Sequence, residues 1–215
     1  VPNSNNEEIS SYSSANNINW HFNPPAAPHQ GGLWESAVRS LKHHLRRVVG
    51  GTMLTYEELY TVLTQIEACL NSRPLSAMSD DPSDLSVLTP GHFLIGQPLL
   101  ATPQQNLLDV KSTRLSRWHL TQKLVQDFWK RWSSEYLTTL QQRNKWRRKQ
   151  NNVQVNDIVL LRDTNCPPQQ WRLGRVIKVH SGEDNLVRVV TIKTKDGEVK
   201  RPVTKISPLP FNNEG

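Results

Sequence analysis

Residues 173–192 have the sequence LGRVIKVHSGEDNLVRVVTI, and this stretch decides the fold expected for the C-terminal part of the chain. Apolar and polar residues alternate on both sides of Ser181-Gly182, a pattern typical of two strands joined by a tight turn. Asp196-Gly197 marks a second hairpin turn. The strands expected in this region are 158–161, 173–179, 186–192, 199–203 and a short run near Ile206. Short strands so closely spaced predict a small β-barrel over 151–211.

Upstream of this barrel, apolar residues recur at helical spacing. Glycines after Val49 end one predicted helix, which opens at Gly32, and Thr55 with Glu58 forms a capping box for the next. The proline-rich stretch 74–110 predicts a long irregular connection. The predicted elements are a short helix at 7–14, a strand at 18–22, helices at 32–49 and 55–72, local order at 92–95 and a long helix at 112–148.

Charge is distributed unevenly along the 215 residues. The chain has a formal net charge of +7 and a pI of about 9.6, with 36% hydrophobic residues. Residues 1–110 hold 5 Lys or Arg against 10 Asp or Glu, whereas 111–215 hold 21 against 9. A basic C-terminal half indicates a polyanionic partner, nucleic acid above all, and argues against a neutral ligand.

Other features of the sequence argue against several classes of protein. No apolar run reaches the 18 residues that a membrane span needs, so no membrane partner is expected. The first residues lack both an initiator Met and a signal-peptide pattern, so we expect an excised or truncated chain. Cys69 and Cys166 are far apart, which predicts neither a disulfide framework nor a zinc site built on Cys pairs. An intracellular, reducing compartment is expected.

One edge of the helix at 32–49 concentrates charge. At about 100° per residue, its carboxylate and three of its bases fall beside the apolar stripe. These residues are Glu35, Arg39, Lys42 and Arg46. An acid among bases suits a phosphate-lined site, although charge pairs on a solvated helix face would give the same pattern.

Five separated segments of the chain carry recognisable motifs. They are NPPAAPHQGGLWES at 23–36, LNSRPL at 70–75, LTPGHFLIG at 88–96, WKRW at 129–132 and RPVTK at 201–205. The first resembles the last catalytic motif of retroelement integrases, with Glu35 at the position of the third acidic metal ligand. In this order the segments resemble BEL/Pao-type retrotransposon integrases, and the resemblance extends over nearly the whole chain from Trp20 to Pro210.

The resemblance implies a polynucleotidyl transferase with a ribonuclease-H-like core. Two aspartates and one glutamate would hold two Mg²⁺ ions for in-line phosphoryl transfer in the intact enzyme. The resemblance further implies that the protein binds the ends of the element and target DNA, with Arg39 and Lys42 contacting the DNA. It also implies that the protein acts as a homo-oligomer in the nucleus.

The sequence departs from this family pattern at the two aspartates, which should precede Glu35. The first Asp is Asp80, and Asp80, Asp81 and Asp84 lie in a Ser- and Pro-containing segment where turn or cap roles are expected. One carboxylate supplies too little negative charge for two dications. We therefore expect Glu35 to be catalytic only with upstream aspartates, and this chain alone to bind Mg²⁺ poorly and to be inactive.

Two further groups of cations are candidate DNA contacts. Alternation places three on the outer face of a strand, namely Arg172, Arg175 and Lys178. Five crowd the predicted end of the long helix, more than the helix dipole explains, namely Arg143, Lys145, Arg147, Arg148 and Lys149. Each group could instead be a solvated surface.

Most of the other notable aromatic and polar residues are expected to have ordinary structural roles. Trp118, Trp129 and Trp132 follow helical spacing and are expected in the core. Trp171 could be exposed to a protein partner. His43 and His44 are adjacent and lack a Cys pair, so no zinc finger and no metal role are expected.

The predicted class is α+β, with three segments: 1–110 as an incomplete ribonuclease-H-like core, 111–150 as a long connecting helix with a basic end, and 151–211 as a Src-homology-3-like DNA-binding barrel. Three hypotheses remain open at this point. They are a fragment of an active integrase polyprotein, a decayed or domesticated copy kept for DNA or chromatin binding, and an unrelated DNA- or chromatin-binding module. The reading frame upstream of Val1 separates the first two.

Overall fold

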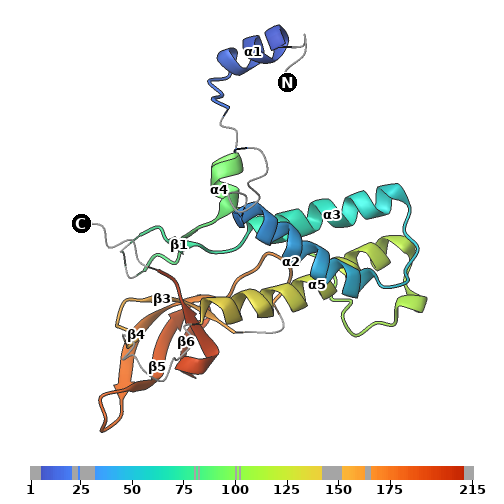
Figure 1. Ribbon diagram of the computed structural model, residues 1–215. Helices are drawn as coiled ribbons and strands as arrows, with labels where there is room; N and C mark the ends of the chain where they lie inside the picture. The colour runs from blue at the N-terminus through green and yellow to red at the C-terminus, as the bar shows by residue number, and fades with distance from the viewer. Residues whose placement is uncertain are drawn as a thin grey trace. The chain divides into compact units, whose positions relative to one another are not determined.

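The computed structural model describes residues 6–20, 24, 32–79, 81, 83–99, 101, 103–141, 152–162 and 166–210. Its contacts divide the chain into two compact units, Val1–Arg39 and Ser40–Gly215. Helices and strands are both present, and the strands of the second unit include a curled antiparallel sheet (Figure 1). The α+β class is therefore confirmed.

In the first unit, helix α1 (Asn6–Ala15) confirms the short helix expected near the N-terminus. The strand expected at 18–22 is wrong for the residues described, because Ile18 to Trp20 form no strand. Asn17 adopts a left-handed conformation with φ 54°, and the Trp20 indole donates to Ser13 Oγ at 2.7 Å. The chain therefore turns back on α1, which prevents extension into a ladder.

Helix α2 (Gly32–Val49) has the predicted bounds, and its residues from Ser40 onward belong to the second unit. Helix α3 (Tyr56–Asn71) begins at the predicted capping box, in which Thr55 Oγ accepts from the Glu58 amide and Glu58 reaches back to the Thr55 amide. Helix α5 (Arg117–Leu140) lies beside α3, as Figure 1 shows.

A buried apolar cluster joins α3 to α5. Its fully or almost fully buried members are Val62, Ile66, Cys69, Leu124, Val125, Phe128, Trp129 and Trp132. The second half of α2 adds Leu41, Leu45 and Val48 at the edge of this cluster. Burial in this cluster raises the pKa of the Cys69 thiol to about 12, so the thiol is protonated and unreactive at neutral pH.

The connection after α3 contains short ordered elements. Strands β1 (Ser76–Ala77) and β2 (Val87–Leu88) pair antiparallel, and α4 (Pro90–Ile95) ends at Gly96 with φ 73°. This helix confirms the local order expected at 92–95. A 3₁₀ turn, η2 (Ser112–Arg114), precedes α5.

Helix α5 is shorter than the helix predicted over 112–148. Ser116 caps its start by accepting from the His119 amide, and the described part of the helix ends at Leu140. Residues 142–151 lie outside the described part of the chain. No helix among the described residues is both long and apolar enough to span a membrane.

The second unit also contains a five-stranded antiparallel sheet with strand order β6-β5-β4-β3-β7. Its strands are β3 (Ile158–Leu161), β4 (Leu173–Ser181), β5 (Val187–Thr194), β6 (Gly197–Pro202) and β7 (Ile206–Pro208), with the 3₁₀ turn η3 (Val203–Lys205) before the last. All five predicted strands are confirmed within a few residues. The sheet curls as a half-barrel (Figure 1).

Both faces of β3 are buried, each by a different partner. Val159 and Leu161 point into the curl of the sheet, whereas Ile158 and Leu160 pack with Leu137 of α5. The Ser207 hydroxyl also donates to the Leu137 carbonyl at 2.9 Å. The end of α5 is therefore part of the core of the sheet rather than a free connecting rod.

Candidate nucleic-acid interface and metal-ligand cluster

The charged edge predicted on α2 is exposed. The structure places Glu35 in the first turn, and all four predicted residues are exposed to solvent, namely Glu35, Arg39, Lys42 and Arg46. The helix edge is therefore accessible to a ligand, as the sequence analysis requires.

The predicted role of Arg175 is wrong. This side chain is only 1% exposed, and its guanidinium donates to the carbonyl oxygens of Ser79 (3.1 Å), Asp84 (2.7 Å) and Asn156 (3.0 Å). Arg175 pairs with Ile158 across the sheet, so it lies on the face of β3 and β4 that the core covers. It ties the segment between β1 and β2 to the sheet and cannot contact DNA.

The other two cations predicted on this strand, Arg172 just before β4 and Lys178 within it, differ from each other. Arg172 is partly buried, and its Nη2 lies 3.7 Å from Asp196 Oδ2. Lys178 is exposed, as predicted. Side chains do not alternate regularly between the two faces of β4, because the pairing with β5 shifts register between Val176 and Lys178. That bulge reverses the order of inward and outward residues along β4.

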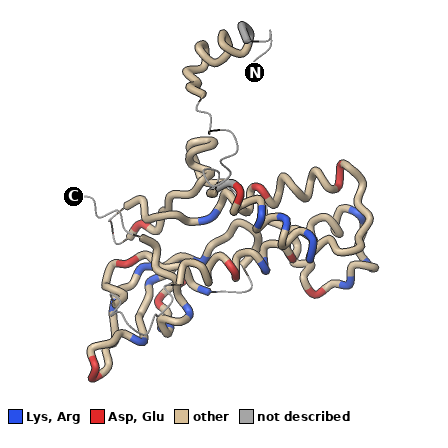
Figure 2. Tube along the Cα trace, in the orientation of Figure 1, with Lys and Arg blue, Asp and Glu red and all other residues tan. Residues whose placement is uncertain are grey.

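Strand pairing assembles a basic face that the sequence analysis missed. Thr191 of β5 pairs with Lys178 on one side and with Lys200 of β6 on the other, so the three side chains form one row. Lys193 lies two residues from Thr191 on the same face of β5, and it is exposed, as are Lys178 and Lys200. We define Lys178, Lys193 and Lys200 as the sheet basic face; Figure 2 marks the basic residues along the chain.

The pKa of His180 is affected by the lysines of this face. Its Nε2 lies 3.0 Å from Thr191 Oγ1, and partial burial lowers the pKa of the imidazole. Lys200 and Lys178 lower the pKa of His180 further. Glu198, which pairs with Lys193, is the acidic neighbour in the register. Lys178 and Lys200 therefore act together on the part of this face around His180.

The basic cluster predicted at the end of the long helix follows Gln141, the residue after the last turn of α5. Its members, Arg143, Lys145, Arg147, Arg148 and Lys149, lie outside the described residues. Flanking residues are described on both sides, and Gln141 donates from Nε2 to the Thr204 carbonyl at 2.8 Å.

The tryptophans are mostly structural. Trp129 and Trp132 are 4% and 5% exposed, which confirms their predicted core role, but Trp118 is 56% exposed and that prediction is wrong. Trp118 lies in the first turn of α5, outside the apolar cluster that joins α3 to α5. Trp171 is packed against Trp129 with ring centroids 4.8 Å apart, so it is not the free aromatic side chain that a protein partner would need.

The aspartates after Glu35 have turn roles, as expected. Asp81 Oδ1 accepts from the amide and hydroxyl of Ser83, and the Asp84 carboxylate accepts in the same way from Ser86. These hydrogen bonds lower the pKa of both carboxyls. Asp80 lies outside the described residues.

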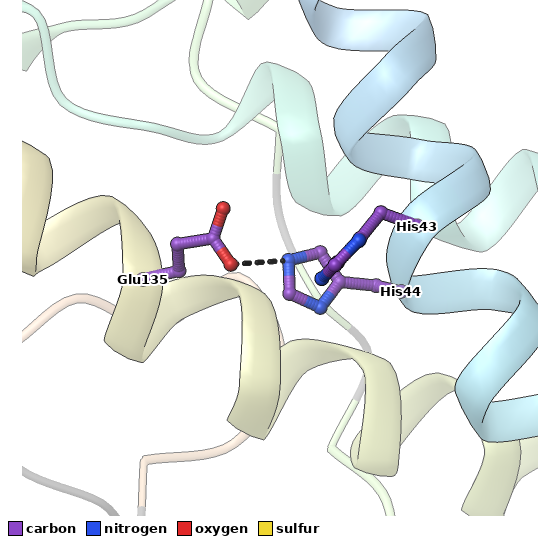
Figure 3. A group of neighbouring side chains, drawn as sticks. All are labelled: His43, His44 and Glu135. Atoms are coloured by element: carbon purple, nitrogen blue, oxygen red, sulfur yellow. Dashed lines mark ion pairs between the residues drawn. The ribbon is translucent and has the colours of Figure 1, made fainter.

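A group of potential metal ligands joins α2 to α5. One ligand atom from each of His43, His44 and Glu135 lies within 4.8 Å of the other two, as Figure 3 illustrates. The sequence analysis expected no metal role for the histidines. Glu135 could not be found from the sequence because it comes from another helix, but His44 has a signal: it occupies a position of the stripe formed by Leu41, Leu45 and Val48.

His44 is the central residue of this group. It is 4% exposed, and its ring packs edge-on against Phe128 with centroids 5.8 Å apart. Its Nε2 lies 3.1 Å from Glu135 Oε2, yet neither ring nitrogen has an aligned hydrogen-bond partner among the described residues. Burial lowers the pKa of His44, Glu135 opposes that shift, and His43 and Arg47 add to it.

A family of unknown function (DUF5641) matches residues 116–209 of the chain. The match begins at the N-cap of α5 and ends just after β7, so the similarity includes the helix and the sheet that share a core. The chain matches no curated protein.

Proposed function

We propose that this chain is the C-terminal part of a BEL/Pao-type retrotransposon integrase and that it binds DNA. The observation that carries the proposal is the ordered series of integrase-like motifs from Glu35 to Lys205. The exposed charged edge of α2 and the curled basic sheet are consistent with it. In this proposal residues 1–110 derive from an incomplete ribonuclease-H-like core, and the protein acts in the nucleus.

The residues that contact DNA in this proposal form three separate sets: the sheet basic face, the five cations of 143–149, and the α2 bases Arg39, Lys42 and Arg46. Exposed lysines that lie in a cross-strand row suit successive phosphates, because their contacts need no base sequence. Arg175 is left out because it is buried, and Arg172 contributes little beside Asp196. The expected binding is salt-dependent and only weakly sequence-specific.

The residues of this chain do not fit a pair of Mg²⁺ ions. Glu35 is the one carboxylate that matches the integrase pattern, and the metal-ligand cluster found among the described residues does not include it. That cluster contains imidazoles, whereas Mg²⁺ prefers oxygen ligands. No catalytic step is therefore assigned to this chain alone, and Glu35 would need two aspartates from elsewhere in the integrase.

The first prediction concerns salt dependence. Changing Lys178, Lys193 and Lys200 together to Gln should reduce the slope of log K against log salt by about 2 to 3, because each lost phosphate contact removes about 0.9. Binding to a fluorescent DNA duplex at several salt concentrations measures the slope. A matched variant in which Lys111, Arg114 and Arg131 become Gln loses the same charge from exposed positions outside the sheet and should keep the slope.

Equal losses of slope in the two variants would contradict the proposed surface, since net charge alone would then explain binding. A third variant, with Gln at the five basic positions of 143–149, should also lose slope. Joining of DNA ends by the purified chain with Mg²⁺ would contradict the catalytic part of the proposal, for which no product is expected.

A further inference from the structure

We propose that His43, His44 and Glu135 bind a single divalent transition-metal ion, of which Zn²⁺ is the best match, between α2 and α5. All three side chains belong to the second unit of the chain, and each offers one ligand atom within 4.8 Å of the others. The site uses none of the residues assigned to DNA binding and has no part in the Mg²⁺ chemistry of integrases.

The separation of His44 and Glu135 suits ligands of one ion. Zn²⁺ lies about 2.0–2.2 Å from a histidine nitrogen or a carboxylate oxygen, so two ligands at the tetrahedral angle are roughly 3.3 Å apart. His44 Nε2 and Glu135 Oε2 are 3.1 Å apart. This distance also allows a hydrogen bond, but the ring nitrogen and the oxygen are not aligned for one. Both lone pairs can instead point to a shared cation.

The buried state of His44 is the second, independent observation. Buried polar groups nearly always have a hydrogen-bond partner, and an unpartnered one calls for an explanation such as an ion. His44 is 4% exposed, and neither ring nitrogen has a hydrogen-bond partner in the described part of the chain. Phe128 packs edge-on against the ring, so the position of Nε2 beside Glu135 is fixed before any ion arrives.

The donor set selects the metal. Two imidazoles and one carboxylate suit zinc and other borderline cations, whereas Mg²⁺ and Ca²⁺ prefer sites made entirely of oxygen. Three protein ligands leave one tetrahedral position for water. The Glu135 side chain is 54% exposed, so this position is open to solvent, and the ion can enter without opening the core.

Arg47 competes with the ion for His43. Its Nη1 donates to His43 Nδ1 at 2.8 Å and to the His43 carbonyl at 3.0 Å. A metal bound at Nδ1 would displace this donor, and one bound at Nε2 would place a proton on Nδ1 facing the guanidinium. Either way, loss of Arg47 should strengthen metal binding, whereas Arg46 is exposed and has no such contact among the described interactions.

Calorimetric titration of the purified full chain with Zn²⁺ tests the site, with Co²⁺ absorption in the visible range to report tetrahedral ligation. E135Q and H43Q change exposed side chains, so both variants should fold normally. Each should weaken Zn²⁺ binding by at least about tenfold, because loss of even a residue that supports a metal ligand indirectly has an effect of this size. E67Q on α3 removes an exposed carboxylate elsewhere and should bind like the wild type. R47Q should bind more tightly, and R46Q should change affinity less than R47Q.

Two outcomes would overturn the site: no saturable Zn²⁺ binding by the wild-type chain, or equal weakening by E67Q and E135Q. Zinc should also raise the Tm of the wild type and not that of E135Q, because the ion ties α2 to α5 and binds the native state. The DNA-binding prediction is tested on Lys178, Lys193 and Lys200, which are not ligands of the zinc site, so failure of the zinc site leaves the proposed function unchanged.

Discussion

Replacing Arg175 with Met is expected to lower the free energy of unfolding by about 3–5 kcal/mol. The guanidinium is 1% exposed and donates to the carbonyls of Ser79, Asp84 and Asn156. Methionine fills similar volume but offers no donor, so these part-buried carbonyl oxygens lose their charged partner, and each group left unsatisfied costs about 1–3 kcal/mol. Urea unfolding followed by circular dichroism measures the change.

Lys178→Met on the same strand is the matched control. It removes the same charge from an exposed position and should change stability by no more than about 0.5 kcal/mol. Similar values for the two variants would show that Arg175 is not the tie between the sheet and the segment after β1. In the Arg175 variant that segment should also become sensitive to protease under native conditions, before the rest of the chain unfolds.

Local signals in the sequence were sufficient for most elements. The Thr55 and Glu58 capping box and the glycines after Val49 set helix ends within a few residues, because the contacts that stop a helix lie within one turn. The strands of the sheet followed from period-two alternation. Strand 18–22 failed because its alternation is equally compatible with a chain that returns to α1 through Asn17.

Contacts distant in the sequence were not predictable from it. The burial of Arg175 depends on the segment between β1 and β2, which covers that face of the sheet, and the order of residues beyond Arg175 depends on a bulge after Val176. Lys178 and Lys200 form a row only through the register of three strands. The hairpin turn at Asp196-Gly197 could have predicted the pairing of β5 with β6. No sequence signal marks the bulge that sets the pairing of β4 with β5.

Replacing Trp171 with Ala is expected to lower the free energy of unfolding by about 3 kcal/mol. This value is near the lower end of the range for buried aromatic residues, because Trp171 is only partly buried. Its ring contacts Trp129, Trp132 and Tyr136, with centroids 4.8, 5.8 and 5.5 Å away. Its indole also donates to Ser72 Oγ at 3.2 Å. Trp171 packs against both the helical cluster and the cluster between α5 and the sheet.

This position gives a second expected result, which concerns cooperativity. In the wild-type chain, the transition seen by tryptophan fluorescence should coincide with that seen by far-ultraviolet circular dichroism, because helices and sheet share Trp171 and the end of α5. In Trp171→Ala the two transitions should separate. Trp118→Ala is the control: that side chain is 56% exposed on α5, and its loss should change stability by about 0.5 kcal/mol or less. If both variants kept a single, equally stable transition, Trp171 would not be the link between the two clusters.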